Sequence, residues 1–225
     1  CKYCPGMIRA LRTAFEDEET KNMAVHSAVH SYNVGDPAYI TGPKASGYPY
    51  LEIDMAVSFS YDLDPEAKAG VLKKVISERV SAPAKVGISA NPVVKDDVLV
   101  VTVEVKAAEA GEYYLGVWFM QDNVYGQQTD GLGIADNSYN YHENCVRSAD
   151  SRFGNTYAGY PLGEIKAGKT VQRTFVLNID KETWKLKDMN NLHFAAFVTA
   201  KNGRNYNVVN VVDCEISEPT PYQYK

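Results

Sequence analysis

The sequence of 225 residues lacks a long apolar run, because no stretch approaches the roughly 18 residues that a membrane-spanning helix needs. It also lacks an excess of basic residues: 23 Lys and Arg stand against 28 Asp and Glu, which gives a net charge of −5. Nucleic-acid-binding domains carry a basic face, so this balance argues against a nucleic acid as partner. The sequence therefore predicts neither a helical membrane protein nor a nucleic-acid-binding protein.

Signatures of catalytic sites are scarce as well. The sequence contains no G-x-S-x-G segment of the kind that carries a nucleophilic serine. His26 and His30 are four residues apart, but no glutamate stands between them as a zinc-protease motif requires. His142 and His193 are isolated in the sequence. These patterns predict structural histidines, no metal site and no cofactor.

The first 82 residues mix helical and strand patterns. Pro5 suits a first helical turn, and apolar residues recur at three-to-four spacing up to Phe15, which predicts a helix. The segments 23–30 and 50–60 are typical of strands, with a loop rich in Gly and Pro between them. Asp64-Pro65 is a helix start signal, and an apolar stripe then predicts a second helix that ends near Pro83. The stripe consists of Val71, Leu72, Val75, Ile76 and Val80.

The rest of the chain is dominated by strand patterns and has no convincing long helix. Turn signals rich in Gly, Asn and Asp separate the strands, at a spacing typical of an immunoglobulin-like β-sandwich. We expect a two-domain α+β protein: a truncated thioredoxin-like α/β domain at 1–82, the sandwich at 84–217, and a C-terminal tail at 218–225. The expected strands lie at 86–90, 98–105, 113–120, 171–179, 191–200 and 206–217.

A pair of cysteines opens the chain as Cys1-x-x-Cys4, followed directly by Pro5. The N-terminus of a helix stabilises negative charge, so a thiolate forms there more easily than elsewhere. In thioredoxin-like domains a loop that ends in a cis-proline packs against such a pair, and Pro49 stands in the comparable place, just before a strand. This pattern favours thiol–disulfide exchange, with Cys1 as nucleophile, Cys4 as resolving thiol and Pro49 shaping the substrate groove.

Three other interpretations of the Cys1–Cys4 pair stay open. The first is an inert disulfide in a domain that only binds. The second is the lipid-bearing first residue of a mature bacterial lipoprotein, at Cys1. The third is half of a zinc site, although no second C-x-x-C follows. Because a thioredoxin-like sheet normally has a strand directly before its C-x-x-C, we also expect the natural protein to extend upstream of Cys1.

Four segments of the sequence resemble one protein family. They are Cys1-x-x-Cys4-Pro5, the segment 23–30, the segment 46–54 around Pro49, and Tyr141-His142-Glu143-Asn144. Over nearly its whole length the chain is similar to the Gram-negative outer-membrane protein family named for a member of about 28 kDa. This resemblance implies a thioredoxin-like domain followed by a β-sandwich, located in the bacterial cell envelope, with adhesion or binding as the usual role.

The chain departs from the family pattern just after the fourth segment. Family members tend to carry a further His and a Leu-Arg pair there, and this chain has Cys145 and Arg147-Ser148 instead. We therefore carry over no role that depends on that histidine.

The stretch 122–164 is unusually long for a connection within a β-sandwich, and it is rich in Gly, Asn, Asp and Tyr. Aromatic rings flanked by amides and carboxylates suit protein or glycan ligands, as in antibody loops. Simple packing of the rings on the sandwich is one alternative, and a calcium site at Asp130, Asp136 and Asn137 is another, although their spacing matches no known loop. The residues that we expect to bind a ligand are Tyr125, Gln127, Tyr139, Tyr141, Asn144 and Tyr157.

Cys145 and Cys214 are the second candidate cysteine pair. Cys145 lies in the stretch 122–164 and Cys214 in the last expected strand, so a disulfide between them would fix this stretch to the sandwich. An oxidising periplasm or cell exterior permits such a bond, and two separate buried thiols are the alternative.

We therefore expect a non-catalytic, adhesin-type binding protein of the bacterial outer membrane or periplasm. Its partner is a protein or glycan, and its membrane association depends on an N-terminal anchor outside the given sequence. The alternative function is a periplasmic or surface thiol–disulfide oxidoreductase that uses Cys1 and Cys4, with Pro49 beside them.

Overall fold

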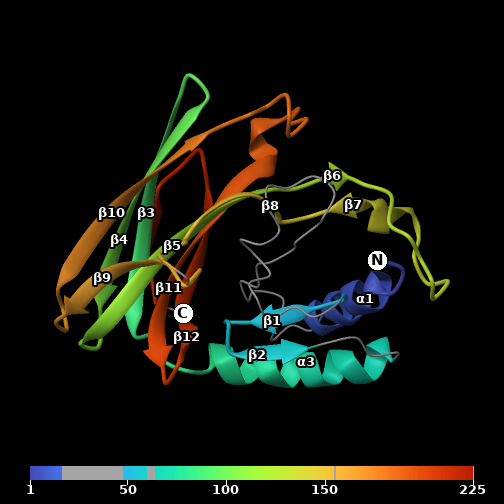
Figure 1. Ribbon diagram of the computed structural model, residues 1–225, viewed down its shortest axis with the longest axis horizontal. Helices are drawn as coiled ribbons and strands as arrows, with labels where there is room; N and C mark the ends of the chain where they lie inside the picture. The colour runs from blue at the N-terminus through green and yellow to red at the C-terminus, as the bar shows by residue number, and fades with distance from the viewer. Residues whose placement is uncertain (17–47, 60–63, 155, 225) are drawn as a thin grey trace.

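The computed structural model describes residues 1–16, 48–59, 64–154 and 156–224. Figure 1 shows a small helical part on one side and a larger β part on the other. The helical part contains α1 (Cys4–Phe15), β1 (Leu51–Ile53), β2 (Val57–Phe59) and α3 (Pro65–Val80), so both predicted helices are confirmed. The predicted strand at 23–30, with His26 and His30, and the predicted loop up to Gly47 lie outside the described residues.

The two helices and β1 share a small hydrophobic core. Asp64 caps α3, because its carboxylate accepts the backbone N–H groups of Glu66 and Ala67 at 3.0 and 3.1 Å. The predicted stripe of α3 is right for Leu72 and Ile76 but wrong for Val71 and Val80, which are exposed because they lie on the outer side of the helix. The buried members of this core are Met7, Ala10, Ala14, Leu51, Ile53, Ala69, Leu72 and Ile76.

The segment 50–60, predicted as one strand, contains a tight hairpin. β1 and β2 pair in antiparallel fashion, with Ile53 opposite Val57. Asp54 and Met55 both have positive φ, at 53° and 55°, which reverses the chain between the two strands. Apolar residues continue through this turn in the sequence, and the strand pattern therefore does not reveal it.

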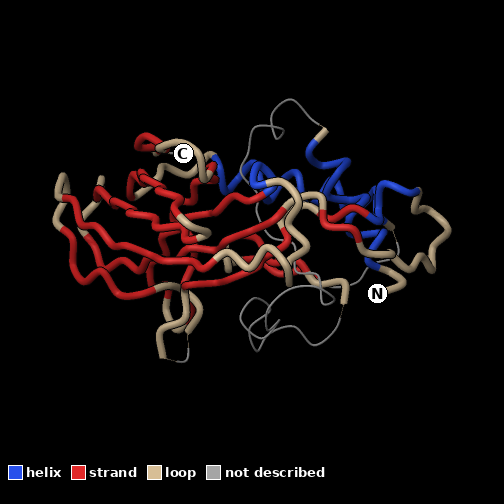
Figure 2. The backbone as a smooth tube through the Cα atoms, turned by 90° about the horizontal axis from the view of Figure 1, so that it is seen from above, coloured by secondary structure: helices blue, strands red, loops and turns tan. Residues whose placement is uncertain are grey.

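Two antiparallel sheets form the larger part, which Figure 2 shows extending away from the helices. One sheet has the order β10-β4-β3-β13 and the other the order β12-β11-β5-β8, with β9 also paired to β5. β5 pairs with β9 along its first half and with β8 along its second half. The strands are β3 (Val86–Lys95), β4 (Val98–Ala107), β5 (Gly111–Gln121), β8 (Cys145–Asp150), β9 (Tyr160–Ile165), β10 (Thr170–Asn178), β11 (Leu192–Asn202), β12 (Asn205–Glu215) and β13 (Thr220–Gln223).

A continuous hydrophobic core lies between the two sheets. Along β4 the side chains of Val101, Val103 and Val105 are fully buried, and they alternate with partly exposed residues, as a strand with one covered face requires. Phe119 of β5 and Phe194 of β11 add two buried rings with centroids 6.1 Å apart. Each such apolar side chain contributes about 1.5–3 kcal/mol on burial, so the two sheets carry most of the stability.

All six predicted strands of the β part are confirmed, but two other predictions are wrong. The segment 218–225 is not a tail, because β13 pairs with β3 at the edge of the sheet. The stretch 122–164 is not one loop, because it contains β6 (Val124–Tyr125), the short 3-10 helix η2 (Asn137–Asn140), β7 (Tyr141–His142), β8 and β9. Strands of two residues are too short to leave a recognisable pattern, while β8 is rich in polar residues and β9 is interrupted by Pro161 and Gly163.

Direct hydrogen bonds join the helical part to the β part. Arg79 of α3 donates to the Asp54 carboxylate at 2.6 Å and to the Val208 carbonyl of β12 at 3.0 Å. The Val208 N–H in turn donates to the Asp54 carbonyl at 2.8 Å. One arginine therefore connects α3, the β1–β2 turn and the edge of a sheet.

Candidate functional site

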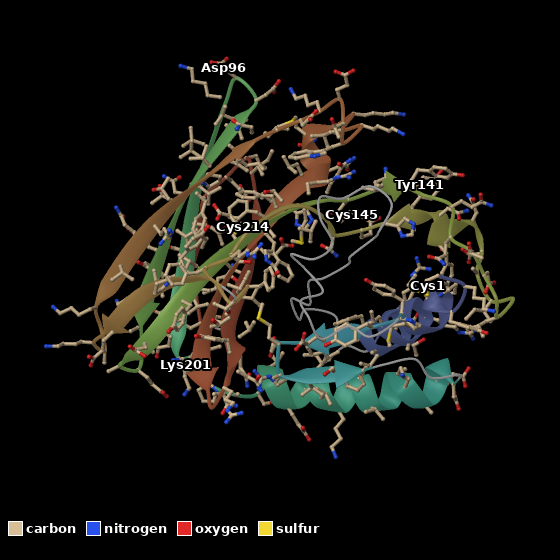
Figure 3. All side chains as sticks on the ribbon, viewed as in Figure 1. Cys1, Asp96, Tyr141, Cys145, Lys201 and Cys214 are labelled. Atoms are coloured by element: carbon tan, nitrogen blue, oxygen red, sulfur yellow. A yellow bond between two sulfur atoms is a disulfide. The ribbon has the colours of Figure 1, made fainter. Side chains whose placement is uncertain are left out.

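Two exposed tyrosines project from the small hairpin of β6 and β7. Tyr125 and Tyr141 are direct partners across this hairpin and are 62% and 43% exposed. Their rings lie edge to face with centroids 5.5 Å apart. Gln127 is exposed two residues after Tyr125. We call Tyr125, Gln127 and Tyr141 the tyrosine tip, and Figure 3 shows Tyr141 at the end of the molecule that also holds Cys1.

Tyr139 lies close to this tip in the sequence but has a different environment. It is only 6% exposed, and the Arg12 guanidinium of α1 stacks over its ring at 4.3 Å from the centroid. Arg12 also donates to the Ser138 hydroxyl at 3.0 Å. Tyr139 therefore fixes η2 to α1, and its ring is not presented to solvent.

Asn144 and Tyr157 also lie apart from the tip. Asn144 has a positive φ of 54°, and its N–H donates to the Asp122 carboxylate at 2.7 Å, so it shapes the turn between β7 and β8. Tyr157 is half-buried between β8 and β9, where the Arg152 guanidinium lies 5.6 Å from its ring centroid. Of the six residues predicted to bind a ligand, the structure brings Tyr125 and Tyr141 into contact, and Gln127 follows Tyr125 by two residues.

The connection between β6 and β7, which we call the 126–140 loop, is docked on the start of α1. The Gln128 side-chain amide donates to the Cys1 carbonyl at 2.8 Å, and the Gly131 N–H donates to the Lys2 carbonyl at 2.7 Å. The loop therefore contacts the backbone between the two N-terminal cysteines.

Two aspartates considered for calcium hold this loop in shape instead. The Asp130 carboxylate accepts the N–H groups of Leu132, Gly133 and Ala135 at 2.7–3.0 Å, and these bonds lower its pKa. Asp136 caps η2 by accepting the Ser138 N–H at 2.7 Å. Within the described part of the chain, no three His, Cys, Asp or Glu side chains are grouped so that they would hold a metal ion.

Cys1 and Cys4 form a disulfide with their Cα atoms 5.4 Å apart. Cys1 is exposed and Cys4 is half-buried at the first residue of α1. The Tyr48–Pro49 peptide bond is cis, as the sequence predicts, and Pro49 is buried two residues before β1 begins. Since β1 and α1 share the small core, one unit carries the disulfide and the strand that follows Pro49.

The predicted disulfide between Cys145 and Cys214 is wrong, because both thiols are free and buried. Cys145 lies on β8 and Cys214 on β12, the two outer strands of the order β12-β11-β5-β8. Three strand spacings of about 4.8 Å separate such strands by about 14 Å, and a disulfide tolerates only about 7 Å between Cα atoms. Burial raises the pKa of both thiols to about 12.

His193 at the start of β11 is held between two carboxylates, a contact that its isolated place in the sequence does not reveal. Nδ1 lies 2.8 Å from Asp213 Oδ1, and Nε2 lies 3.3 Å from Asp122 Oδ1 without the alignment of a hydrogen bond. Burial lowers the pKa of His193, but the close contacts and negative charges of the two carboxylates outweigh it and raise this pKa to about 10. The approach of Asp122 and Asp213 to His193 can be predicted only when β5 and β12 are known to flank β11.

Gly163–Thr170 has the letter spacing of a phosphate-binding loop, G-x-x-x-x-G-K-T. The structure places this segment in the hairpin between β9 and β10. A phosphate-binding loop needs a helix that begins directly after the glycines. A strand follows here, so the spacing carries no phosphate site.

None of the described helices is both long and apolar enough to cross a bilayer. A family model described as "Outer membrane protein Omp28" matches residues 37–219. No curated protein sequence matches the chain.

Two solved structures from Porphyromonas gingivalis are similar to this chain. HBP35 covers 98% of this chain and 73% of its own, with 20% identity and a TM-score of 0.71, so the two proteins share a fold. A domain of the outer membrane lipoprotein Omp28 covers 59% of this chain and 88% of its own, with 19% identity and a TM-score of 0.37.

Proposed function

The chain belongs to the Omp28 outer membrane protein family, and on that premise we propose that it is a non-catalytic binding protein of the cell envelope. The family match places it in the bacterial cell envelope. In this proposal the tyrosine tip contacts a protein or glycan ligand at the cell surface or in the periplasm. Membrane association through an N-terminal lipid anchor is part of the same proposal.

One observation carries the proposal, namely that Tyr125 and Tyr141 are exposed together on a braced hairpin. The Gly126 N–H donates to the Asn140 carbonyl and the His142 Nε2 lies 2.9 Å from the Gly126 carbonyl, so the hairpin is held at the point where it joins the 126–140 loop. A rigid aromatic pair offers a large contact area at a small entropy cost, and Gln127 adds hydrogen-bonding capacity beside it.

The domain architecture predicted from the sequence is part of the proposal too. Separate hydrophobic cores support a thioredoxin-like unit at 1–82 and an immunoglobulin-like sandwich at 84–217. The buried Tyr113 donates its hydroxyl to the Glu109 carbonyl at 2.8 Å, a contact similar to the tyrosine corner of immunoglobulin-like sandwiches. A binding loop at one end of such a sandwich is a recurrent arrangement.

The test compares the chain with the variant Tyr125→Ser/Tyr141→Ser on a glycan array and on immobilised extracellular-matrix proteins. The matched control is Tyr222→Ser/Tyr224→Ser, because these tyrosines are a second pair of exposed rings, on the edge of the β part. We expect the tip variant to lose at least about tenfold in affinity, since paired aromatic anchors dominate small interfaces. If both variants lose affinity equally, or if the wild-type chain binds nothing on the arrays, the proposed role of the tip is refuted.

A second candidate, a thiol–disulfide oxidoreductase, is favoured by the Cys1–Cys4 disulfide at the start of α1. Cys1 is the exposed member, as expected for the sulfur that a substrate thiol attacks, and Cys4 lies at the helix N-terminus, where a thiolate is stabilised. In this candidate Pro49 shapes the substrate groove.

The reduction potential of the pair decides between the two candidates. A value below about −300 mV marks a structural bond, and one between about −270 and −120 mV supports exchange. Insulin reduction by the wild-type chain, absent in Cys1→Ser, is the second requirement of the oxidoreductase candidate.

A further inference from the structure

The 126–140 loop contacts the disulfide-closed segment directly, and this contact points to a control of the tyrosine tip. We propose that the Cys1–Cys4 disulfide is a redox latch: the oxidised pair holds the loop on α1, and reduction by an external dithiol releases it. The inference rests on the proposed function of the tip and adds its regulation.

Two backbone carbonyls receive the loop, and both belong to the segment that the disulfide closes. The Cys1 carbonyl accepts the Gln128 amide at 2.8 Å and the Cys4 N–H at 3.3 Å. The Lys2 carbonyl accepts the Gly131 N–H at 2.7 Å. Cys1 and Lys2 precede the first residue of α1, so the covalent ring of four residues fixes the direction of these carbonyls more than the helix does.

The fit between the loop and this segment is close. A Cβ atom on Gly131 would lie 3.1 Å from both the Cβ and the carbonyl oxygen of Lys2. Such a contact depends on the exact path of residues 1–3, because a small rotation of the segment breaks the hydrogen bonds or forces the loop away. The oxidised geometry is therefore the one that the loop matches.

A short path of hydrogen bonds leads from the latch to the tip. The backbone N–H of Gln128 donates to the Asn140 side chain at 2.8 Å, while the Gln128 side chain holds the Cys1 carbonyl. The Asn140 carbonyl in turn accepts the Gly126 N–H, next to the paired Tyr125 and Tyr141. Loss of the latch removes the support beneath Tyr125 and Tyr141, while Arg12 still holds η2 through Tyr139.

The chemical step is ordinary thiol–disulfide exchange with an external dithiol as reductant. One thiolate of the dithiol attacks Cys1 Sγ, the exposed sulfur, and the Cys1–Cys4 bond breaks as Cys4 leaves as a thiolate and takes up a proton. The second thiol of the dithiol then attacks the reductant sulfur that is bonded to Cys1 Sγ. The mixed disulfide breaks, and Cys1 is released as a thiol. Two electrons pass to the protein, and the dithiol leaves as a disulfide.

Hydrogen–deuterium exchange of the full chain tests the latch without any ligand. Dithiothreitol acts only on the Cys1–Cys4 bond, because the other two cysteines, Cys145 and Cys214, are free. We expect the amides of Gly126 and Gly131 to exchange about tenfold faster or more after reduction, while the amides of β5 keep their protection. Unchanged exchange at Gly126 and Gly131 overturns the latch.

Two variants make the test specific. Cys1→Ser/Cys4→Ser should exchange fast at Gly131 without reductant and show no further change when dithiothreitol is added. Gln128→Ala should speed exchange at Gly126 while the disulfide stays intact. A Cys1→Ser/Cys4→Ser variant that exchanges as slowly as the oxidised chain refutes the proposal.

Failure of the latch and failure of the proposed function are distinguishable. The exchange result decides on the latch whether or not any ligand binds. If the tip binds a ligand in the array test with equal affinity in both redox states and exchange is also unchanged, the proposed function stands and the latch falls.

Discussion

His193 gives the clearest quantitative prediction, because a buried imidazole between two carboxylates ties stability to pH. The ring is 7% exposed, and its pKa rises from 6.5 to about 10 in the folded chain. At about 1.36 kcal/mol per pH unit this difference sets an upper bound of about 5 kcal/mol. The side chains of Asp122 and Asp213 are 36% and 40% exposed, so water screens their charge, and we expect about 2–3 kcal/mol.

The sign follows from proton binding in the two states. Below pH 6.5 the ring is protonated in both the folded and the unfolded chain, so the full stabilisation is present. As the pH rises from 6.5 towards 10, the unfolded chain gives up this proton while the folded chain keeps it, and the stabilisation is lost. The free energy of unfolding should therefore fall across this window.

The assay is urea unfolding of the wild type and of His193→Gln at about pH 6, 7.5 and 9, followed by tryptophan fluorescence. The variant should be less stable by about 2–3 kcal/mol at pH 6, and the gap should narrow by pH 9. Asp213→Asn should remove part of the pH dependence, and His142→Gln, which replaces a buried imidazole bonded to a carbonyl, should retain it. If the difference in free energy of unfolding between the wild type and His193→Gln is constant with pH, or grows towards pH 9, the reasoning is refuted.

Three further substitutions test other parts of the fold. Gly159→Ala should lower the free energy of unfolding by about 3 kcal/mol or more, because φ is +110° and a Cβ would lie 2.5 Å from the Leu115 carbonyl carbon. The control Gly154→Ala has φ +59° and open space around it, so it should lower the free energy of unfolding by only about 1 kcal/mol. Thermal unfolding of the pair measures this, and equal losses contradict the packing argument. Asp64→Ala should lower the stability of the chain by about 1 kcal/mol through loss of the α3 cap, and Asp64→Ser should recover most of it; a neutral Asp64→Ala in urea unfolding contradicts the cap. Arg79→Met should cost about 1–2 kcal/mol and should speed amide exchange at Val208, while Lys74→Met on the same helix should do neither; unchanged exchange at Val208 shows that Arg79 does not join the two parts.

Much of the fold is visible in the sequence because its signals are local. The apolar spacing of α1, the cap and apolar spacing of α3, and the Val-rich runs that become β4 and β12 each lie within one short window. The hairpin at Asp54-Met55 is missed because apolar residues continue through it, and the edge strand β13 is missed because it has only four residues and Pro221 interrupts them. The edge strand forms only because β3 offers it an unpaired side.

The candidate site is predictable only in part, for the same reason. Aromatic composition indicates the tyrosine tip, but it does not separate Tyr125, which is exposed, from Tyr139, which Arg12 covers. The cis bond at Pro49 is predictable from a local pattern. The prediction of a Cys145–Cys214 disulfide is wrong, because the strand order that separates the two cysteines is not visible in the sequence. The contacts of His193 likewise join β11, β12 and the turn after β5, which no sequence spacing relates.

The docking of the 126–140 loop has a consequence for biogenesis. Gln128 and Cys1 are 127 positions apart, and Arg79 and Val208 are 129 positions apart, so both contacts close very long chain loops. In a chain that emerges N-terminus first, the opening cysteines appear long before the residues that cover them. Oxidation of Cys1 and Cys4 during this interval would fix the conformation of residues 1–4 before the 126–140 loop is synthesised and docks on them.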